Sequence, residues 1–177
     1  DVYKRQVTHL SSFLTFQSAL FNKALISLGL RFNWNSHEED ILIAPRINID
    51  FSLDRGWGNI IYNSGTYFQN PPEKYLSIVD NNDLKTINTF QHSLTFEKLI
   101  TNSTKFSISI YKKNYHHAPM MDNNQAFTDP TFLLDELRTY SNIISNGKAE
   151  TSGVEILLEK KRAINFYGLV GGSVYNL

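Results

Sequence analysis

Alternation of apolar and polar residues over long stretches is the feature of the sequence that most limits its possible folds. The stretch "ALISLGLRFNW", Ala24–Trp34, has an apolar side chain at every second position. A period of two makes one face of a β-strand apolar and the other largely polar. Similar alternation, over 11 to 13 residues each time, occurs in Val7–Ala19, Ile41–Leu53, Gly58–Gln69, Ile87–Lys98 and Thr104–Tyr115.

A hairpin near the end of the chain supplies two further predicted strands. It has the sequence "GVEILLEKKRAINFYGLV" and covers residues 153–170. In its first run, apolar residues alternate with Glu155, Leu157 and Glu159. The second run is less regular, because Phe166 and Val170 lie on one face while the apolar residues Tyr167 and Leu169 lie on the other. The sequence therefore predicts eight strands in succession.

The lengths of these strands favour a membrane protein over a soluble one. The average strand in soluble proteins has about 5–6 residues, whereas a tilted strand needs roughly 9–11 residues to cross a bilayer. The connections also alternate between short and long, as do the periplasmic turns and extracellular loops of outer-membrane barrels. Short connections are predicted at Leu20–Lys23, Asp54–Trp57, Leu99–Ser103 and Lys160–Ala163, and long ones at Asn35–Asp40, Asn70–Thr86 and from His116 to about Lys148.

Composition narrows the possibilities further. The chain has 17 basic and 17 acidic residues, so its formal net charge is zero and gives no electrostatic reason to expect a nucleic acid partner. It has no cysteine, which excludes disulfides and thiolate metal sites. Asparagine outnumbers lysine and arginine combined, and 13% of the residues are aromatic. Such a composition favours β structure with polar loops.

Five stretches, taken in order, carry a resemblance to a known family. They are "APRINIDFSL", "NSGTYFQNPP", "QHSLTFEKLI", "FSISIYKKNYHHAP" and "NGKAETSGVEILLEKKRAINFYGLVGGSVY". Together they resemble the β-barrel domain of TonB-dependent outer-membrane receptors, in the style found in Bacteroidota. The sequence departs from that pattern at Ser64-Gly65-Thr66-Tyr67, where Tyr-Gly is usual.

The resemblance implies part of a larger barrel, because such receptors have about 22 strands around a plugged lumen. The expected fold class is all-β: an antiparallel up-and-down transmembrane barrel segment, with about eight long strands in an open curved sheet. Residues 7–177 would form this partial barrel, and nothing in them resembles the plug domain or the TonB box. Residues 1–6, "DVYKRQ", look like a translated adapter scar and are not expected to belong to the native fold.

The same resemblance implies a bacterial outer-membrane location and active uptake of a scarce nutrient, with energy delivered through TonB. The nutrient would be a metal chelate, cobalamin or a glycan. The expected partners are outer-membrane lipid, the rest of the barrel with its plug domain, TonB through a missing N-terminal part, and a small extracellular ligand. No bond is made or broken in such transport, so no enzymatic activity and no cofactor are expected.

Strand parity assigns the side chains to two faces under this interpretation. The residues expected to face the lumen are Arg31, Arg46, Asp50, Asn63, Glu155 and Glu159. Those expected to face lipid are Ile26, Leu28, Ile47, Phe51, Ile108 and Ile156. A basic residue on the lipid face costs about 2–4 kcal/mol at the bilayer midplane, and the charges named here fall on the other face.

The sequence gives little support for a catalytic site or a metal site. His116 and His117 with Asp122 invite a metal interpretation, but adjacent residues on an extended chain point to opposite sides, so a solvated loop tip is preferred. Glu155 and Glu159 are too far apart for a clean general acid–base pair and fit a hydrated lumen wall better. No catalytic, cofactor or metal residues are therefore assigned.

Two alternatives remain open at this stage. A complete eight-strand barrel, acting as an anchor or adhesin, would require its first and last strands to pair. A soluble β-sandwich binding module would require the apolar faces to meet in one core.

Overall fold

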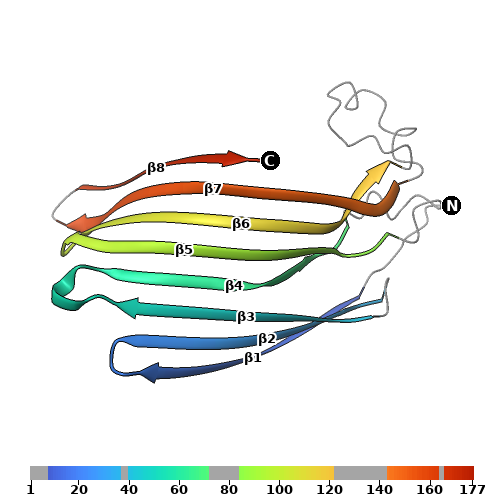
Figure 1. Ribbon diagram of the computed structural model, residues 1–177, viewed down its shortest axis with the longest axis horizontal. Coiled ribbons are helices and arrows are strands. Elements are labelled where there is room, and N and C mark those ends of the chain that lie inside the picture. The colour runs from blue at the N-terminus through green and yellow to red at the C-terminus, as the bar shows by residue number, and fades with distance from the viewer. Residues whose placement is uncertain (1–7, 37–39, 72–83, 122–142, 164–165) are drawn as a thin grey trace.

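The computed structural model describes residues 8–36, 40–71, 84–121, 143–163 and 166–177. These residues form eight strands in one antiparallel sheet, in the order β1 to β8 (Figure 1). The strands are β1 (His9–Leu20), β2 (Ala24–Asn35), β3 (Ile41–Ser52), β4 (Asn59–Gln69), β5 (Ile87–Thr101), β6 (Thr104–Met121), β7 (Ile143–Ala163) and β8 (Phe166–Asn176). The predicted fold class, an open sheet of about eight long antiparallel strands, is confirmed.

The alternation of the sequence sets the register of this sheet. Leu28 lies opposite Ile47 on the neighbouring strand, and Ile108 lies opposite Ile156. Residues directly opposite each other share a face, so such pairs collect the apolar side chains on one side of the sheet. A slip of one residue would send a whole strand's apolar set to the polar side, which makes the register strongly specified.

A single layer of strands makes up the described part of the chain. Its fully buried apolar residues are few, namely Ala44, Leu84 and Ile143. Leu28 and Ile156, in the middle of the apolar face, are 47% and 48% exposed. Within the described residues the apolar faces do not meet in a core, so the sandwich alternative is not supported.

The edges of the sheet are β1 and β8, which lie on opposite sides of Figure 1. No pairing joins them in the part of the chain that the structure describes. The complete eight-strand barrel, which needs that pairing, is therefore not supported either. Edge strands left open in this way present unpaired N–H and C=O groups to a further strand.

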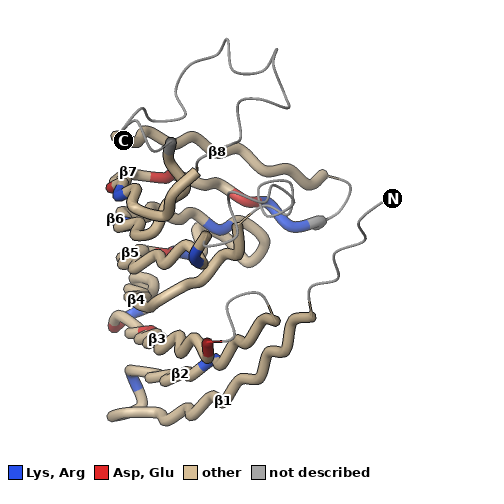
Figure 2. The backbone as a smooth tube through the Cα atoms, turned by 90° about the vertical axis from the view of Figure 1, so that its right-hand side faces the viewer, with Lys and Arg blue, Asp and Glu red and all other residues tan. Residues whose placement is uncertain are grey.

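The sheet is twisted and curls towards its polar face. Figure 2 shows β1 and β2 running obliquely to β7 and β8, as the right-handed twist of strands requires. At one end, His9 Nδ1 on β1 lies 3.1 Å from Asn70 Nδ2, just beyond β4. In a flat sheet three strand spacings would separate them by about 14 Å. The face that carries His9 is therefore concave at this end.

The tight turns lie together at the other end of the sheet (Figure 1). A 3₁₀ turn, Asp54–Gly56, joins β3 to β4, and the Leu53 N–H donates to the carbonyl oxygen of Gly58 at 2.8 Å. A 2.7 Å ion pair between Lys23 and Asp54 links this turn to the one before it. Among the described residues no helix is long and apolar enough to cross a membrane.

Two predicted connections are wrong in their extent. The connection placed from His116 to about Lys148 is shorter, because β6 continues to Met121 and β7 begins at Ile143. The link placed at Lys160–Ala163 is strand: Lys160 pairs with Thr104 and with Gly168. In the first place Met120 and Met121 pair with Ile144 and Ile143, beyond two register shifts that interrupt the alternation. In the second place the ladder continues through charged residues, because main-chain hydrogen bonds need no apolar alternation. From β1 to the start of β6, the predicted strand ends fall within three residues of those observed.

Two glycines in the β3–β4 turn offer a matched test of this geometry. A Cβ on Gly58, which has φ +124°, would overlap the carbonyl oxygen of Glu97, whereas one on Gly56, with φ +70°, meets nothing within 4 Å. We expect Gly58→Ala to lower the free energy of unfolding by about 3 kcal/mol or more, and Gly56→Ala by about 1 kcal/mol. Denaturant titration of the folded protein in lipid vesicles measures both. Equal losses would contradict this account of the turn.

Candidate functional site

The cross-strand register divides the predicted site residues between the two faces of the sheet. Arg31 lies opposite Ala44, which shares a face with Arg46 and Asp50 on β3. The rows through Asn48–Asn63 and through Asp50, Ile61, Thr95, Ser109 and Glu155 extend that face across the sheet. All six residues predicted to face the lumen therefore lie on one face, and the six predicted to face lipid lie on the other. Whether these faces meet a lumen and lipid stays a prediction.

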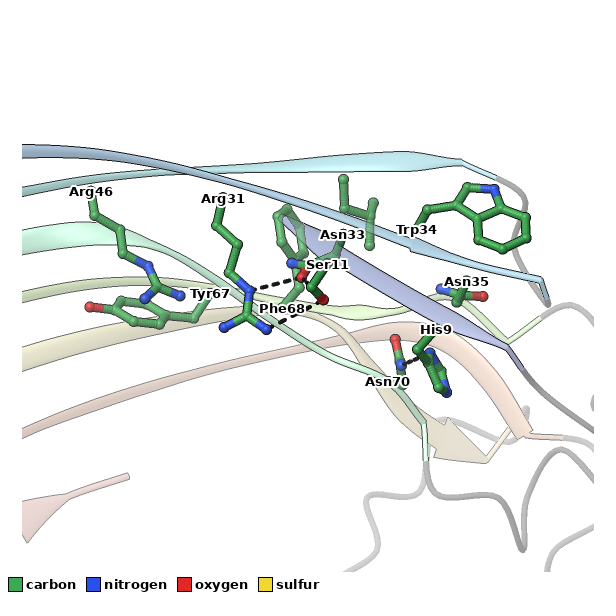
Figure 3. A pocket seen from close by; sticks show the side chains of 11 residues that line it. His9, Ser11, Arg31, Asn33, Trp34, Asn35, Arg46, Tyr67, Phe68 and Asn70 are labelled. Atoms are coloured by element: carbon green, nitrogen blue, oxygen red, sulfur yellow. Dashed lines mark hydrogen bonds between the residues drawn. The ribbon is translucent and has the colours of Figure 1, made fainter. Parts of the chain in front are cut away.

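A hollow of about 290 Å³ lies on the concave face, at the end away from the tight turns (Figure 3). Its polar lining comes from four adjacent strands. β1 contributes Ser11, β2 contributes Arg31 and Asn33, β3 contributes Arg46, and β4 contributes Tyr67. Figure 3 shows both arginine side chains directed into the same space. We refer to it as the arginine hollow.

Small residues beside Arg46 make room for its side chain. Its cross-strand partners are Gly29 on β2 and Gly65 on β4. A Cβ on Gly65 would come within 2.8 Å of the Arg46 Cγ and 2.9 Å of the Pro45 carbonyl oxygen, so only glycine fits there without displacement. The guanidinium carbon lies 4.3 Å from the centre of the Tyr67 ring, in a cation–π contact.

Arg31 is held differently, by neutral oxygen atoms. Its Nε donates to Asn33 Oδ1 at 2.9 Å, and its Nη2 donates to Ser11 Oγ at 3.4 Å. The Ser11 hydroxyl in turn donates to Asn33 Oδ1 at 2.9 Å. The small Ala44 opposite Arg31 leaves the space over β3 open. Arg31 and Arg46 are diagonal neighbours on adjacent strands, a relation that puts Cβ atoms roughly 7–8 Å apart.

Neutral polar pairs cover the middle of the concave face. Asn48 Nδ2 donates to Asn63 Oδ1 at 2.6 Å, and the Thr95 and Ser109 hydroxyls lie 2.8 Å apart. Each pair joins two neighbouring strands through their side chains. Asn63, one of the residues predicted to face the lumen, is thus hydrogen-bonded to Asn48 and lies outside the arginine hollow.

Acidic residues gather towards the turn end of the same face. Lys105 Nζ lies 3.3 Å from Glu97 and 3.9 Å from Glu159, so one lysine serves two carboxylates. Asp50 and Glu155 occupy a single cross-strand row that is closer to the turns than Arg46. The concave face is therefore basic at one end and mainly acidic at the other.

The convex face also carries a few polar groups. The Tyr62 hydroxyl lies 3.0 Å from His92 Nδ1. Beside them, Lys112 forms a 2.8 Å ion pair with Glu150. At the turn end, Lys98 Nζ lies 4.8 Å from the centre of the Trp57 ring. Aromatic rings and lysines of this kind are typical of membrane–water interfaces.

The structure brings only part of the predicted site together. Arg31 and Arg46 share a hollow, whereas Asp50, Asn63, Glu155 and Glu159 lie elsewhere on the concave face. The sequence reading did not single out Tyr67 as a neighbour of Arg46, although its odd parity in β4 puts it on that face. His9 was also missed, because its contact with Asn70 depends on curvature that no local pattern encodes.

The metal interpretation of the histidine pair gains no support. His116 and His117 lie within β6 rather than at a loop tip, and His116 pairs with Asn88 and Lys148. Asp122 falls outside the described residues. Across the described ranges, no group of three or more metal-binding side chains is found.

Comparison with protein families gives the fold its context. Residues 2–176 match the family described as TonB dependent receptor-like, beta-barrel. The chain belongs to this family. The barrel segment is also similar in fold to the FrpB iron transporter from Neisseria meningitidis (F3-3 variant), with a TM-score of 0.64 and 11% sequence identity. That match covers 98% of this chain and 27% of the transporter chain. No match was found among curated proteins.

The facing of the barrel segment can be tested with one matched pair of neighbours on β7. Ile156 and Glu155 are adjacent and exposed on opposite faces. We expect Ile156→Arg to destabilise the folded receptor in lipid vesicles by about 2–4 kcal/mol, because it places a charge in the hydrocarbon layer. We expect Glu155→Arg, on the wet face, to change stability by less than about 1 kcal/mol. Equal costs in denaturant titration would contradict the assigned facing.

Proposed function

We propose that this chain is a wall segment of an outer-membrane receptor that imports a scarce nutrient with TonB-coupled energy. Family membership supports this proposal, and so does the distribution of side chains between the two faces. The central observation is a one-layer sheet whose apolar face is left exposed while its other face is polar and concave. Such a sheet is stable when lipid covers its apolar face and water fills the lumen.

The two open edges fit the same proposal. In a large barrel β1 and β8 would each pair with a further strand, which satisfies the main-chain groups that this segment leaves free. The tight turns would lie on the periplasmic side and the longer connections on the extracellular side. The expected partners are outer-membrane lipid, the rest of the barrel with its plug domain, TonB and a small extracellular ligand.

The ligand class follows from the proposal only in outline: a metal chelate, cobalamin or a glycan. The lumen wall holds and guides such a ligand without covalent chemistry, so no enzymatic activity is proposed. The concave face offers hydrogen-bonding amides, hydroxyls and guanidinium groups, which suit a hydrated polar ligand.

Uptake by cells tests the proposed function. A strain that lacks the gene is compared with a complemented strain, each with and without TonB. The probes are radiolabelled ferric citrate, radiolabelled cyanocobalamin and a fluorescent maltooligosaccharide. We expect at least one probe to accumulate only when both the receptor and TonB are present. Accumulation of every probe without regard to the gene or to TonB would contradict the proposal.

A further inference from the structure

We propose that Arg31 and Arg46 form a subsite for an oxyanion group, a carboxylate or a phosphate, carried by the imported ligand. This inference rests on the proposed function, because it assigns the ligand chemistry that the lumen wall recognises. It narrows the ligand from any polar solute to one that is anionic where it meets the arginine hollow.

The first argument is that no carboxylate among the described residues neutralises the positive charges of Arg31 and Arg46. The two guanidinium groups share one hollow, and the described residues that line it include no carboxylate. Among the described residues neither arginine forms an ion pair, although the whole chain has equal numbers of basic and acidic residues. The positive charge is thus a local arrangement rather than a consequence of a basic protein. Two like charges on adjacent strands repel each other, and a bound anion removes that cost.

The second argument is that the hollow is constructed to hold guanidinium groups in place. Arg46 occupies a slot between Gly29 and Gly65, with its ring partner Tyr67 alongside. Its Nε is buried and has no hydrogen-bond partner among the described residues. An arginine fixed in this way loses little conformational freedom when an anion binds.

The third argument concerns the hydrogen bonds that remain free. Arg31 donates hydrogen bonds from Nε to Asn33 and from Nη2 to Ser11. Both partners are neutral, so its full positive charge stays available to an anion. No contact uses its Nη1 within the described ranges. The paired N–H groups of a guanidinium match the two oxygens of a carboxylate or phosphate.

The described acids of the same face form no ion pair with either arginine. Asp50 is four residues from Arg46 on β3, a separation of roughly 13 Å. Glu97 and Glu159 are already engaged by Lys105. An anion entering from the loop end would meet Arg31 and Arg46 before it reached the acidic end of the face, and this order favours capture there.

Calorimetric titration of the purified full-length receptor with citrate and with pyrophosphate tests the subsite, and maltotriose serves as an uncharged comparison. We expect both anions to bind more weakly as salt concentration rises. Arg31→Gln and Arg46→Gln should each weaken binding at least about tenfold, and the double variant about a hundredfold. Maltotriose binding should be the same in all variants.

Lys113→Gln is the matched control. Lys113 lies on the same face and in the same cross-strand row as Arg46, and its Nζ lies 5.0 Å from the centre of the Tyr111 ring. It does not line the arginine hollow. We expect it to leave anion binding unchanged. Gly65→Ala, which keeps both charges but displaces the Arg46 side chain, should weaken binding as Arg46→Gln does.

Two results would overturn the subsite. One is that Lys113→Gln weakens binding as much as the double arginine variant. The other is that the wild-type receptor binds neither anion; a fall of more than about 5 °C in the thermal unfolding temperature of the double variant would then assign the arginines to a carboxylate elsewhere in the receptor.

The outcome is separable from that of the proposed function. If import of a probe requires TonB but is unchanged in the double arginine variant, the subsite is wrong and the transport function stands. If the purified receptor binds citrate through both arginines but cells show no TonB-dependent import, the subsite stands and the transport function is wrong.

Discussion

The main-chain hydrogen bonds between neighbouring strands hold this structure together, because no second layer of protein covers the sheet in the described residues. Eight strands of 11 to 21 residues are joined only to their sequence neighbours in the described sheet. In a soluble protein such a sheet would need a packed core on one side. In a bilayer the requirement changes: every backbone polar group must be paired, and the apolar side chains may stay uncovered. Long strands with an exposed apolar face meet the requirement of a bilayer. They do not meet that of a soluble protein, because they lack a packed core.

Once the ladder fixes the register, glycines decide where large side chains can lie on the concave face. Arg46 extends across Gly65, and the Tyr111 ring lies over Gly153, where a Cβ would come within 2.7 Å of the tyrosine hydroxyl. In each case the glycine is the cross-strand neighbour of the large residue. In this single-layer sheet, large side chains of the concave face are thus held in place because they lie flat over the backbone of the next strand. This packing fixes the guanidinium of Arg46 without burying it in a protein interior.

The sequence predicted the fold well and the arginine hollow only in part, for physical reasons. Alternation is a local signal, so the existence of strands, the division of side chains between two faces and most strand ends could be predicted from it, as in Ala24–Asn35. In the extensions of β6 and β7, Met120 and Met121 pair with Ile144 and Ile143 beyond two register shifts, and these shifts interrupt the period of two that a strand prediction relies on. Parity could assign Arg31 and Arg46 to one face. Their association with Tyr67 and the approach of His9 to Asn70 depend on diagonal neighbours and on curl of the sheet.

The charged residues of the convex face bear on where the proposed bilayer boundary lies. Lys98 shares a face with Phe96 and Leu94, and Lys112 shares that face on β6. Phe106, opposite Lys98, is six residues from Lys112, or about 20 Å along the strand. With a strand tilt of about 40°, this corresponds to about 15 Å of membrane depth, against an apolar band of about 25 Å in such barrels. The two lysine stems can make up the difference by extending in opposite directions, with Trp57 beside one head group and Glu150 beside the other. On the proposed facing, the bilayer would be confined to the stretch between them, and the basic end of the concave face would lie near its outer boundary.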